Sequence, residues 1–238
     1  MKNKIMNRLL LLMTLVLVFS GSCKKDAPGI SYGSMTDQDG NTYKTVVIGT
    51  QTWMAENLKT TKYNDNKDIP YVTGNSAWIN LTTPGYSWYD NDETVNKPNY
   101  GALYNWYTVL TGKLCPTGWH VPTDAEFNTL ELFLGIPLEQ IDLWGWRGTN
   151  EGANIKSETG WDAGGNGTNT SGFSALPGGY RYGANGSFMG IGVISYWWSI
   201  TEDGLDVSWY RRLDGTNSAI YKATTSKKAG KYVRCVKD

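Results

Sequence analysis

Few side chains in this sequence of 238 residues could carry acid–base, nucleophilic or metal chemistry. There is a single histidine, His120, which excludes any zinc site that needs two imidazoles. A serine triad would also have to use His120. That residue stands between Trp119 and Val121, directly before a predicted helix, and this position favours a structural role. Carboxylate, cysteine and aromatic side chains remain as the groups that could act.

Paired carboxylates could cleave a glycosidic bond. The nearest pairs along the chain are Glu202 with Asp203 and Glu139 with Asp142. Adjacent carboxylates are common in loops, and nothing in the sequence fixes their separation or removes them from water. A hydrolase therefore stays an alternative. The glycine-rich segment 164–172 lacks the lysine and hydroxyl residue of a phosphate-binding loop.

Asp90, Asp92 and Glu93 form an acidic cluster whose oxygens suit a hard cation such as calcium. Their spacing is not that of an EF-hand. The Glu-Pro-Asn and Gln-Pro-Asp motifs of calcium-dependent sugar binding are absent, and the nearest match, at residues 97–99, begins with a lysine. We expect no catalytic cofactor, and any calcium at this cluster would be structural.

The aromatic content is high, with 11 Trp and 15 Tyr. These side chains combine a large apolar face with a polar edge, which suits sugar or protein binding. The residues that we single out as ligand-binding candidates lie in or beside predicted loops: Trp144, Trp146, Arg147, Trp161, Asp162, Tyr180 and Arg181. The alternative is that such rings pack under long loops in place of regular structure.

Lys+Arg and Asp+Glu number 22 each, so the formal net charge is zero. A neutral chain lacks the basic field that holds nucleic acid, so we expect no nucleic-acid partner. A hydrophobic share of 40% is ample for a folded core.

Residues 1–22 read as an export signal, because basic residues precede a short apolar run that cannot span a bilayer as a helix. Small residues and Cys23 follow, which resembles the lipobox of bacterial lipoproteins. An ordinary signal peptide is the alternative. Residues 23–35 would be a lipidated tether, and its charges resemble those that direct some Bacteroidota lipoproteins to the cell surface. We expect an outer-membrane lipoprotein, held to the membrane by its lipid and facing the cell exterior.

Lipidation of Cys23 would leave Cys115 and Cys235 as a pair in an oxidising compartment. We expect them to form a disulfide, which would close a loop of about 120 residues and stabilise the fold by roughly 4–5 kcal/mol on a chain-entropy estimate. Two separately buried thiols are the alternative.

The order of the predicted strands, helices and loops indicates a single α+β domain over residues 36–238, which must position the side chains named above. One helix is predicted over residues 101–110 from its apolar spacing. A second begins after Thr123, where Thr123 and Glu126 form a capping box, and ends at Gly135. Residues 62–100 are predicted to be loop-rich, and Gly, Asn, Ser and Trp dominate from residue 145 onward. Strands are predicted at 43–48, 52–55, 173–176, 193–200, 207–213 and 232–236.

Several stretches, in this order along the chain, resemble the Fibrobacter succinogenes major paralogous domain: residues 39–43, 48–58, 101–106, 115–127, 172–181, 197–199 and 233–236. The string from Ile48 to Leu58 is highly specific. The resemblance covers residues 36–238 and implies a secreted or surface lipoprotein without an established activity.

A more distant resemblance concerns the fold. Residues 121–127 are similar to a helix start in formylglycine-generating enzymes, and residues 233–236 are similar to their C-terminal strand. This implies a C-type-lectin-like fold with twisted antiparallel strands, two helices, and long loops that form the ligand face. Those enzymes need a copper-binding cysteine pair, which Cys115 and Cys235 do not match, so we expect no enzyme.

We therefore expect noncatalytic binding at the cell surface, to a polysaccharide, a glycan or another protein. A structural envelope protein without a small ligand is the first alternative. An unrecognised hydrolase is the second.

Overall fold

A computed structural model describes residues 29–238. The signal segment 1–22 and the expected lipidation site Cys23 lie outside the described residues. Strand β1 (Tyr32–Thr36) begins ahead of the boundary predicted at residue 36, so the folded part already starts within the predicted tether. Within residues 29–238, no helix has the length and apolar character needed to cross a membrane.

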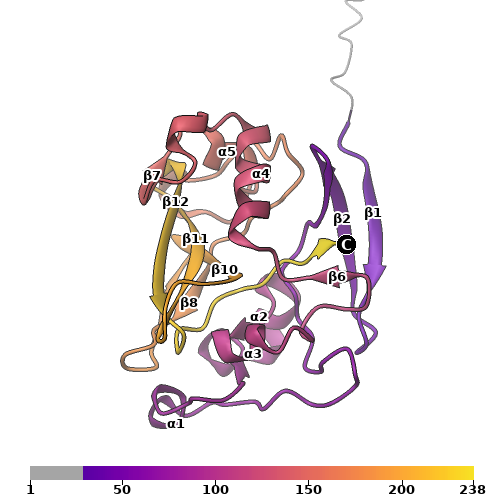
Figure 1. Ribbon diagram of the computed structural model, residues 1–238, viewed down its shortest axis with the longest axis vertical. Coiled ribbons are helices and arrows are strands. Elements are labelled where there is room, and N and C mark those ends of the chain that lie inside the picture. The colour runs from indigo at the N-terminus through magenta and orange to yellow at the C-terminus, as the bar shows by residue number, and fades with distance from the viewer. Residues whose placement is uncertain (1–28) are drawn as a thin grey trace, which may run out of the picture.

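Two antiparallel-rich sheets form the frame of the domain (Figure 1). The five-stranded sheet has the order β1, β2 (Thr42–Ile48), β3 (Gln51–Met54), β13 (Val236–Lys237) and β6 (Trp119–His120). The six-stranded sheet has the order β7 (Gly145–Arg147), β12 (Asn217–Ser226), β11 (Val207–Asp214), β10 (Ile194–Glu202), β8 (Gly178–Arg181) and β9 (Phe188–Ile191). A separate small pair joins β4 (Tyr86–Ser87) to β5 (Leu103–Tyr104).

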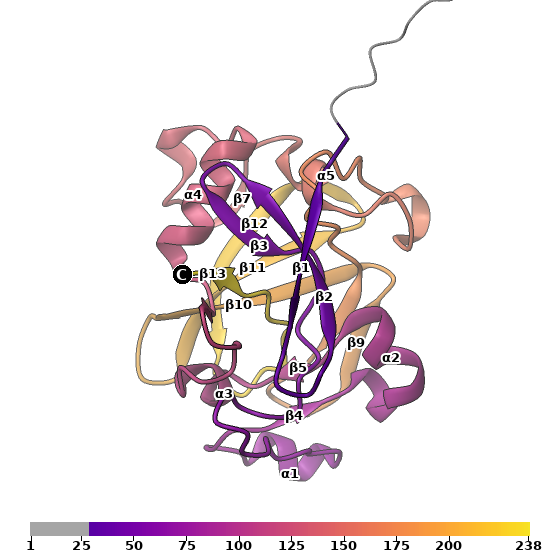
Figure 2. The ribbon, with the colours of Figure 1, turned by 90° about the vertical axis from the view of Figure 1, so that its right-hand side faces the viewer.

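Five α-helices surround the sheets in the described part of the chain, where the sequence predicts two. They are α1 (Asn75–Ile79), α2 (Glu93–Tyr100), α3 (Trp106–Leu110), α4 (Asp124–Leu134) and α5 (Glu151–Ile155). The mixed α+β class is confirmed. Figures 1 and 2 show α4 and α5 at one end of the molecule and α1 at the other.

Helix α4 confirms the predicted capping box. The Thr123 hydroxyl accepts a hydrogen bond from the Glu126 backbone N–H, and the Glu126 carboxylate accepts one from the Thr123 backbone N–H. Gly135 ends the helix at φ +110°, a conformation that favours glycine.

The other predicted helix is wrong in its first half. Residues 103–104 pair in β5, and α3 starts only at Trp106, because the Asn105 side chain caps it by accepting from the Thr108 N–H. Helix α2 lies in a region that we predicted to be loop-rich. Asp92 caps its start, because the Asp92 carboxylate accepts a hydrogen bond from the Val95 N–H.

The strand predicted at 173–176 does not form, and of the one predicted at 232–236 only Val236 lies in a strand, at the start of β13. The carbonyls of Phe173 and Ser174 accept hydrogen bonds from the buried guanidinium of Arg234 instead of from a neighbouring strand. A side chain thus takes the place of a strand ladder at residues 173–174, whereas the carbonyls of residues 232, 233 and 235 still accept backbone N–H groups of other segments.

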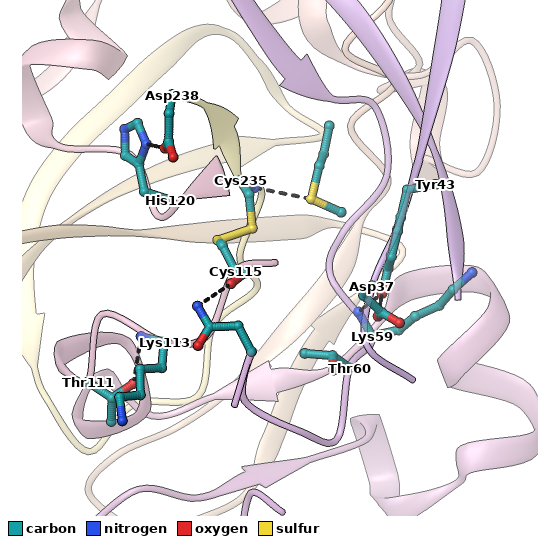
Figure 3. Close-up of a disulfide and its surroundings, with 12 residues drawn as sticks. Asp37, Tyr43, Lys59, Thr60, Thr111, Lys113, Cys115, His120, Cys235 and Asp238 are labelled. Atoms are coloured by element: carbon teal, nitrogen blue, oxygen red, sulfur yellow. Dashed lines mark hydrogen bonds and ion pairs between the residues drawn. A yellow bond between two sulfur atoms is a disulfide. The ribbon is translucent and has the colours of Figure 1, made fainter. Parts of the chain in front are cut away.

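The disulfide between Cys115 and Cys235 is confirmed (Figure 3). It links the segment before α4 to the residue next to β13, and its two Cα atoms lie 6.0 Å apart. Around it, tryptophans fill the interior. Five of them are less than 2% exposed: Trp53, Trp78, Trp88, Trp106 and Trp198. Much of the aromatic surplus therefore belongs to the core.

Candidate ligand-binding surface

One face of the six-stranded sheet carries a line of large side chains that runs across the strands. The register pairs Trp146 of β7 with Tyr221 of β12, Tyr221 with Arg212 of β11, and Arg212 with Tyr196 of β10. Cross-strand partners point to the same face of a sheet. Tyr180 of β8 continues the line, with its ring centroid 4.7 Å from that of Tyr196. We call these five residues the aromatic row.

The rings of the row form a continuous line once Tyr210, which lies beside the row, is included. The Trp146 and Tyr221 centroids lie 5.1 Å apart in a T-shaped pair. Tyr210 fills the diagonal position between them and Tyr196, with ring centroids 6.3 Å from Tyr221 and 5.3 Å from Tyr196. Four strand spacings separate β7 from β8, which gives the row a length of about 19 Å.

The row is more exposed at its ends than in its middle. Trp146 is 39% exposed at one end. At the other end Tyr180 is half-buried, and its neighbour Tyr182, outside the row and with its ring centroid 6.4 Å from that of Tyr180, is 45% exposed. Tyr196 and Tyr210, in the middle, are only 8% and 9% exposed. The row therefore offers two protruding aromatic ends with a recessed centre.

A guanidinium occupies that centre. Arg212 lies 5.4 Å from the ring centroid of Trp146, 5.6 Å from Tyr221 and 5.7 Å from Tyr196. Burial lowers the pKa of Arg212, but the hydrogen bond to Asp214 and the nearby hydroxyls outweigh it and raise the pKa. Its Nε–H is buried and finds no hydrogen-bond partner among residues 29–238. The row thus holds a permanent cation at its centre.

A second cation lies beneath the row. The ammonium of Lys231 is 3.9 Å from the Tyr196 ring centroid and 4.3 Å from that of Tyr210. Burial, and then the charge of Arg212, lowers the pKa of Lys231 well below its ordinary value. Lys231 is enclosed and cannot reach a ligand, so it supports the rings from below.

Of the predicted binding residues, Trp146 and Tyr180 belong to the row and Trp144 does not. Gly145, at φ +88°, turns the chain between the two tryptophans. Trp144 is 59% exposed and packs against Trp209, which alternates along β11 with Tyr210 and so points to the opposite face.

Arg147 and Arg181 are fully buried and cannot reach a surface ligand. Arg147 donates to both carboxylate oxygens of Glu131. Arg181 donates to the carbonyls of Gly186, Val72 and Thr73, which ties β8 to the segment before α1. Both guanidinium groups are structural.

Trp161 and Asp162 belong to a loop outside the aromatic row. Trp161 is 4% exposed, and its Nε1–H donates to the carbonyl of Ala175. Asp162 is exposed and closes against Gly192, where its backbone N–H donates to the Gly192 carbonyl at 2.8 Å. Their packing accounts for these residues without a ligand.

Two residues of the acidic cluster stabilise the first turn of α2. Asp92 caps the helix, and Glu93 pairs with Lys97 at 2.9 Å. Asp90 stands exposed at φ +49°. Within residues 29–238, no three His, Cys, Asp or Glu side chains gather in a way that could hold a metal ion.

The single histidine lies between two carboxylates, of which Figure 3 shows Asp238 beside the ring. Nδ1 of His120 lies 2.6 Å from Asp238, and Nε2 lies 2.7 Å from Glu126. Neither nitrogen is free to take a proton from a hydroxyl nucleophile. Of the carboxylate pairs, Glu202 forms an ion pair with Lys227.

One comparison with known proteins gives a match. The family model described as the Fibrobacter succinogenes major domain matches residues 46–237. The chain belongs to this family. The matched residues include the whole aromatic row and both cysteines of the disulfide, so these features lie within the Fibrobacter succinogenes major domain. No curated protein and no solved structure matches the chain.

Sequence reasoning missed four residues of this domain's surface: Tyr196, Tyr210, Arg212 and Tyr221. Each lies in a run with strand composition, and the alternation of Tyr210 with Arg212 is a signal that they share a face. Their meeting with Trp146 depends on strand register between distant segments, which alternation alone does not fix.

Proposed function

We propose that this protein is a lipid-anchored, noncatalytic surface protein that binds a polysaccharide or glycan chain along the aromatic row. The observation that carries the proposal is the row itself, with contiguous rings over about 19 Å and exposed aromatic ends. A long, shallow line of rings suits an extended chain better than a compact small molecule.

The chemistry of the row supports a sugar ligand. Aromatic faces and edges accommodate the apolar C–H surface of sugar rings, and tyrosine hydroxyls offer hydrogen bonds at the same sites. Arg212 adds a permanent positive charge on a side chain that is partly exposed. The zero net charge of the chain argues against a nucleic-acid ligand.

We further propose that the domain is a C-type-lectin-like variant of the α+β class, on the sequence similarities described above. Anchoring through Cys23 and an outer-membrane location facing the exterior rest on the signal segment alone. The binding of another protein along the row, in place of a glycan, remains a competing outcome of the test below.

A structural envelope role is the second candidate, and one observation favours it. Tyr196 and Tyr210 are more than 90% covered, so the middle of the row also stabilises the sheet. If that is its whole purpose, changes at the exposed ends will alter stability and nothing else.

The test is a glycan and polysaccharide array with the purified full chain, run with calcium and with EDTA. We expect saturable binding that survives EDTA, because the acidic cluster has protein partners at Asp92 and Glu93. Trp146→Ala and Tyr180→Ala should each weaken binding about tenfold, equal to 1.4 kcal/mol.

Trp144→Ala is the matched control, since Trp144 is more exposed than Trp146 and lies on the opposite face. It should bind as the wild type does. Equal loss in Trp144→Ala and Trp146→Ala, or no glycan binding by the wild type, would refute the row as a glycan site.

A further inference from the structure

A pocket of about 240 Å³ opens between β2, the segment after β3, and α2. Figure 2 shows β2 with α2 beside its lower end. None of the residues of the aromatic row lines this pocket. The two places are therefore separate, and the inference below does not rest on the glycan proposal.

The pocket collects positive charge in a chain whose net charge is zero. Lys44, Lys59 and Lys97 line it, against one carboxylate from Glu56. Lys97 is paired with Glu93, outside the lining. Among residues 29–238, Lys44 and Lys59 have no carboxylate partner, and their ammonium groups lie over the rings of Tyr32 and Tyr43 respectively.

A buried cation completes the wall. Arg234 is 1% exposed, and its Nε–H donates to Oδ1 of Asn57 at 2.8 Å. Its two terminal nitrogens donate to the carbonyls of Phe173 and Ser174. Within the described part of the chain, no carboxylate bonds to this guanidinium. Burial lowers the pKa of Arg234 to about 9, which leaves it charged at neutral pH.

Neutral hydrogen-bonding groups are placed around these charges. Asn57 is held in one orientation, since its amide N–H donates to the Tyr100 carbonyl and its oxygen accepts from Arg234 and Trp197. The rest of the polar lining comes from Tyr32, Asn99, Ser157 and Ser174.

The carboxylate of Glu56 restricts which ligands the pocket can bind. One of its oxygens accepts the backbone N–H of Lys44 at 2.9 Å. A carboxylate in the wall repels a simple anion such as phosphate but accepts hydrogen bonds from hydroxyl groups. A ligand that carries both hydroxyls and one negative charge satisfies both Glu56 and the lysines. The pocket is smaller than the ~300–1,000 Å³ of drug-sized sites, which limits the ligand to about one sugar ring.

Seven of the fifteen residues that line the pocket lie in four of the seven stretches that resemble the family, and the lysines lie outside them. The four stretches contribute Ala55, Glu56 and Asn57, then Gly101, then Ser174 and Leu176, and finally Arg234. By contrast, only Tyr180 of the aromatic row lies in such a stretch.

We propose that this pocket binds a sugar acid of monosaccharide size, with its carboxylate held by Lys44 and Lys59 and its hydroxyls by Glu56 and the neutral polar groups. The ligand could be the end of a chain or a free sugar, because the chemistry recognised is the same.

The test is isothermal titration of the full chain with D-glucuronate, D-galacturonate and N-acetylneuraminate, beside D-glucose and inorganic phosphate. At least one sugar acid should bind, more weakly at high salt. The double variant Lys44→Gln/Lys59→Gln should lose affinity at least about tenfold, and Glu56→Gln should weaken the sugar acid without weakening phosphate. Lys67→Gln, at an exposed lysine outside the pocket, is the control and should leave the affinity unchanged.

Several results would overturn the proposal. They are no binding of any sugar acid, equal binding of glucose or phosphate, or unchanged affinity in the double lysine variant. Trp146→Ala should retain sugar-acid binding, and the lysine variant should retain polysaccharide binding. Failure of one site is thereby distinguished from failure of the other. A methyl glycoside of the sugar acid mimics the non-reducing end of a chain. If it binds as tightly as the free sugar acid, the pocket accepts a chain end.

Discussion

Arg147 donates to both carboxylate oxygens of Glu131, at 2.7 and 2.9 Å, and neither side chain is more than 1% exposed. The pair joins β7 to α4, and Arg211 adds a third bond to the same carboxylate from β11. A helix is thus fixed on the sheet by buried charges. Such an arrangement tolerates the loss of one partner poorly, because the other charge remains buried.

Arg147→Met should therefore lower the free energy of unfolding by about 3–5 kcal/mol. The double variant Arg147→Met/Glu131→Leu should lose less than the two single changes added together, since no unpaired carboxylate is left. Urea denaturation measures both. Lys67→Gln, on the surface, should stay within about 0.5 kcal/mol of the wild type. A ligand-binding role for Arg147 would instead show lower affinity at unchanged stability.

His120 predicts a pH-dependent term in stability. Burial lowers its pKa, but the hydrogen bonds to Asp238 and Glu126 outweigh burial and leave the pKa raised. A raised histidine pKa contributes stability that is complete below the ordinary value of about 6.5 and is lost as pH rises through the folded value. His120→Asn should remove that dependence. The ring is part-exposed, so the effect should be about 1 kcal/mol or less in urea denaturation between about pH 5.5 and 8.5.

The difference in free energy of unfolding between wild type and variant should shrink from about pH 5.5 to 8.5. Its size is close to the uncertainty of free energies from urea denaturation, so replicate curves are needed. A difference that grew with pH would show that the fold favours the neutral ring, and that Asp238 and Glu126 do not raise the pKa of His120.

Lys231 predicts the opposite dependence on pH. Its folded pKa lies well below the ordinary value, so between the two values the unfolded chain binds more protons than the folded chain. Stability should therefore rise with pH in that window, until tyrosines begin to ionise. Lys231→Met should flatten the rise and stabilise the protein at neutral pH. Denaturation of both proteins across the range tests this, with Lys62→Met as an exposed control. A destabilised Lys231→Met would mean that the contacts with Tyr196 and Tyr210 outweigh the cost of burial.

The elements that the sequence predicted well have local signals. Thr123 and Glu126 cap α4 within one turn, and Gly135 ends it, so all the information lies within the helix. Helix α2 escaped prediction because Pro98 near its end reads as a breaker, although Asp92 could have been read as its cap.

The candidate site was predictable only in part, for a non-local reason. Arg147 and Arg181 looked like surface residues because charged side chains are rarely buried without partners. Their partners, Glu131 and the carbonyls of Val72 and Thr73, come from distant segments. Likewise, Trp146 joins the aromatic row through strand pairing with Tyr221, which no local pattern specifies.

The disulfide links the stability of the fold to the pocket. Cys115 and Cys235 are 120 positions apart, and a loop of that length is worth about 4–5 kcal/mol in the chain-entropy model. Cys115→Ser/Cys235→Ser should lower the free energy of unfolding by about that amount, measured by urea denaturation against Cys23→Ser as a cysteine control. Cys235 adjoins Arg234 in the pocket wall, so sugar-acid affinity should also fall, while polysaccharide binding on the other sheet is retained. Two reactive thiols in the denatured, unreduced wild type would contradict the bond, and equal loss of both ligands would show general unfolding instead of a local effect.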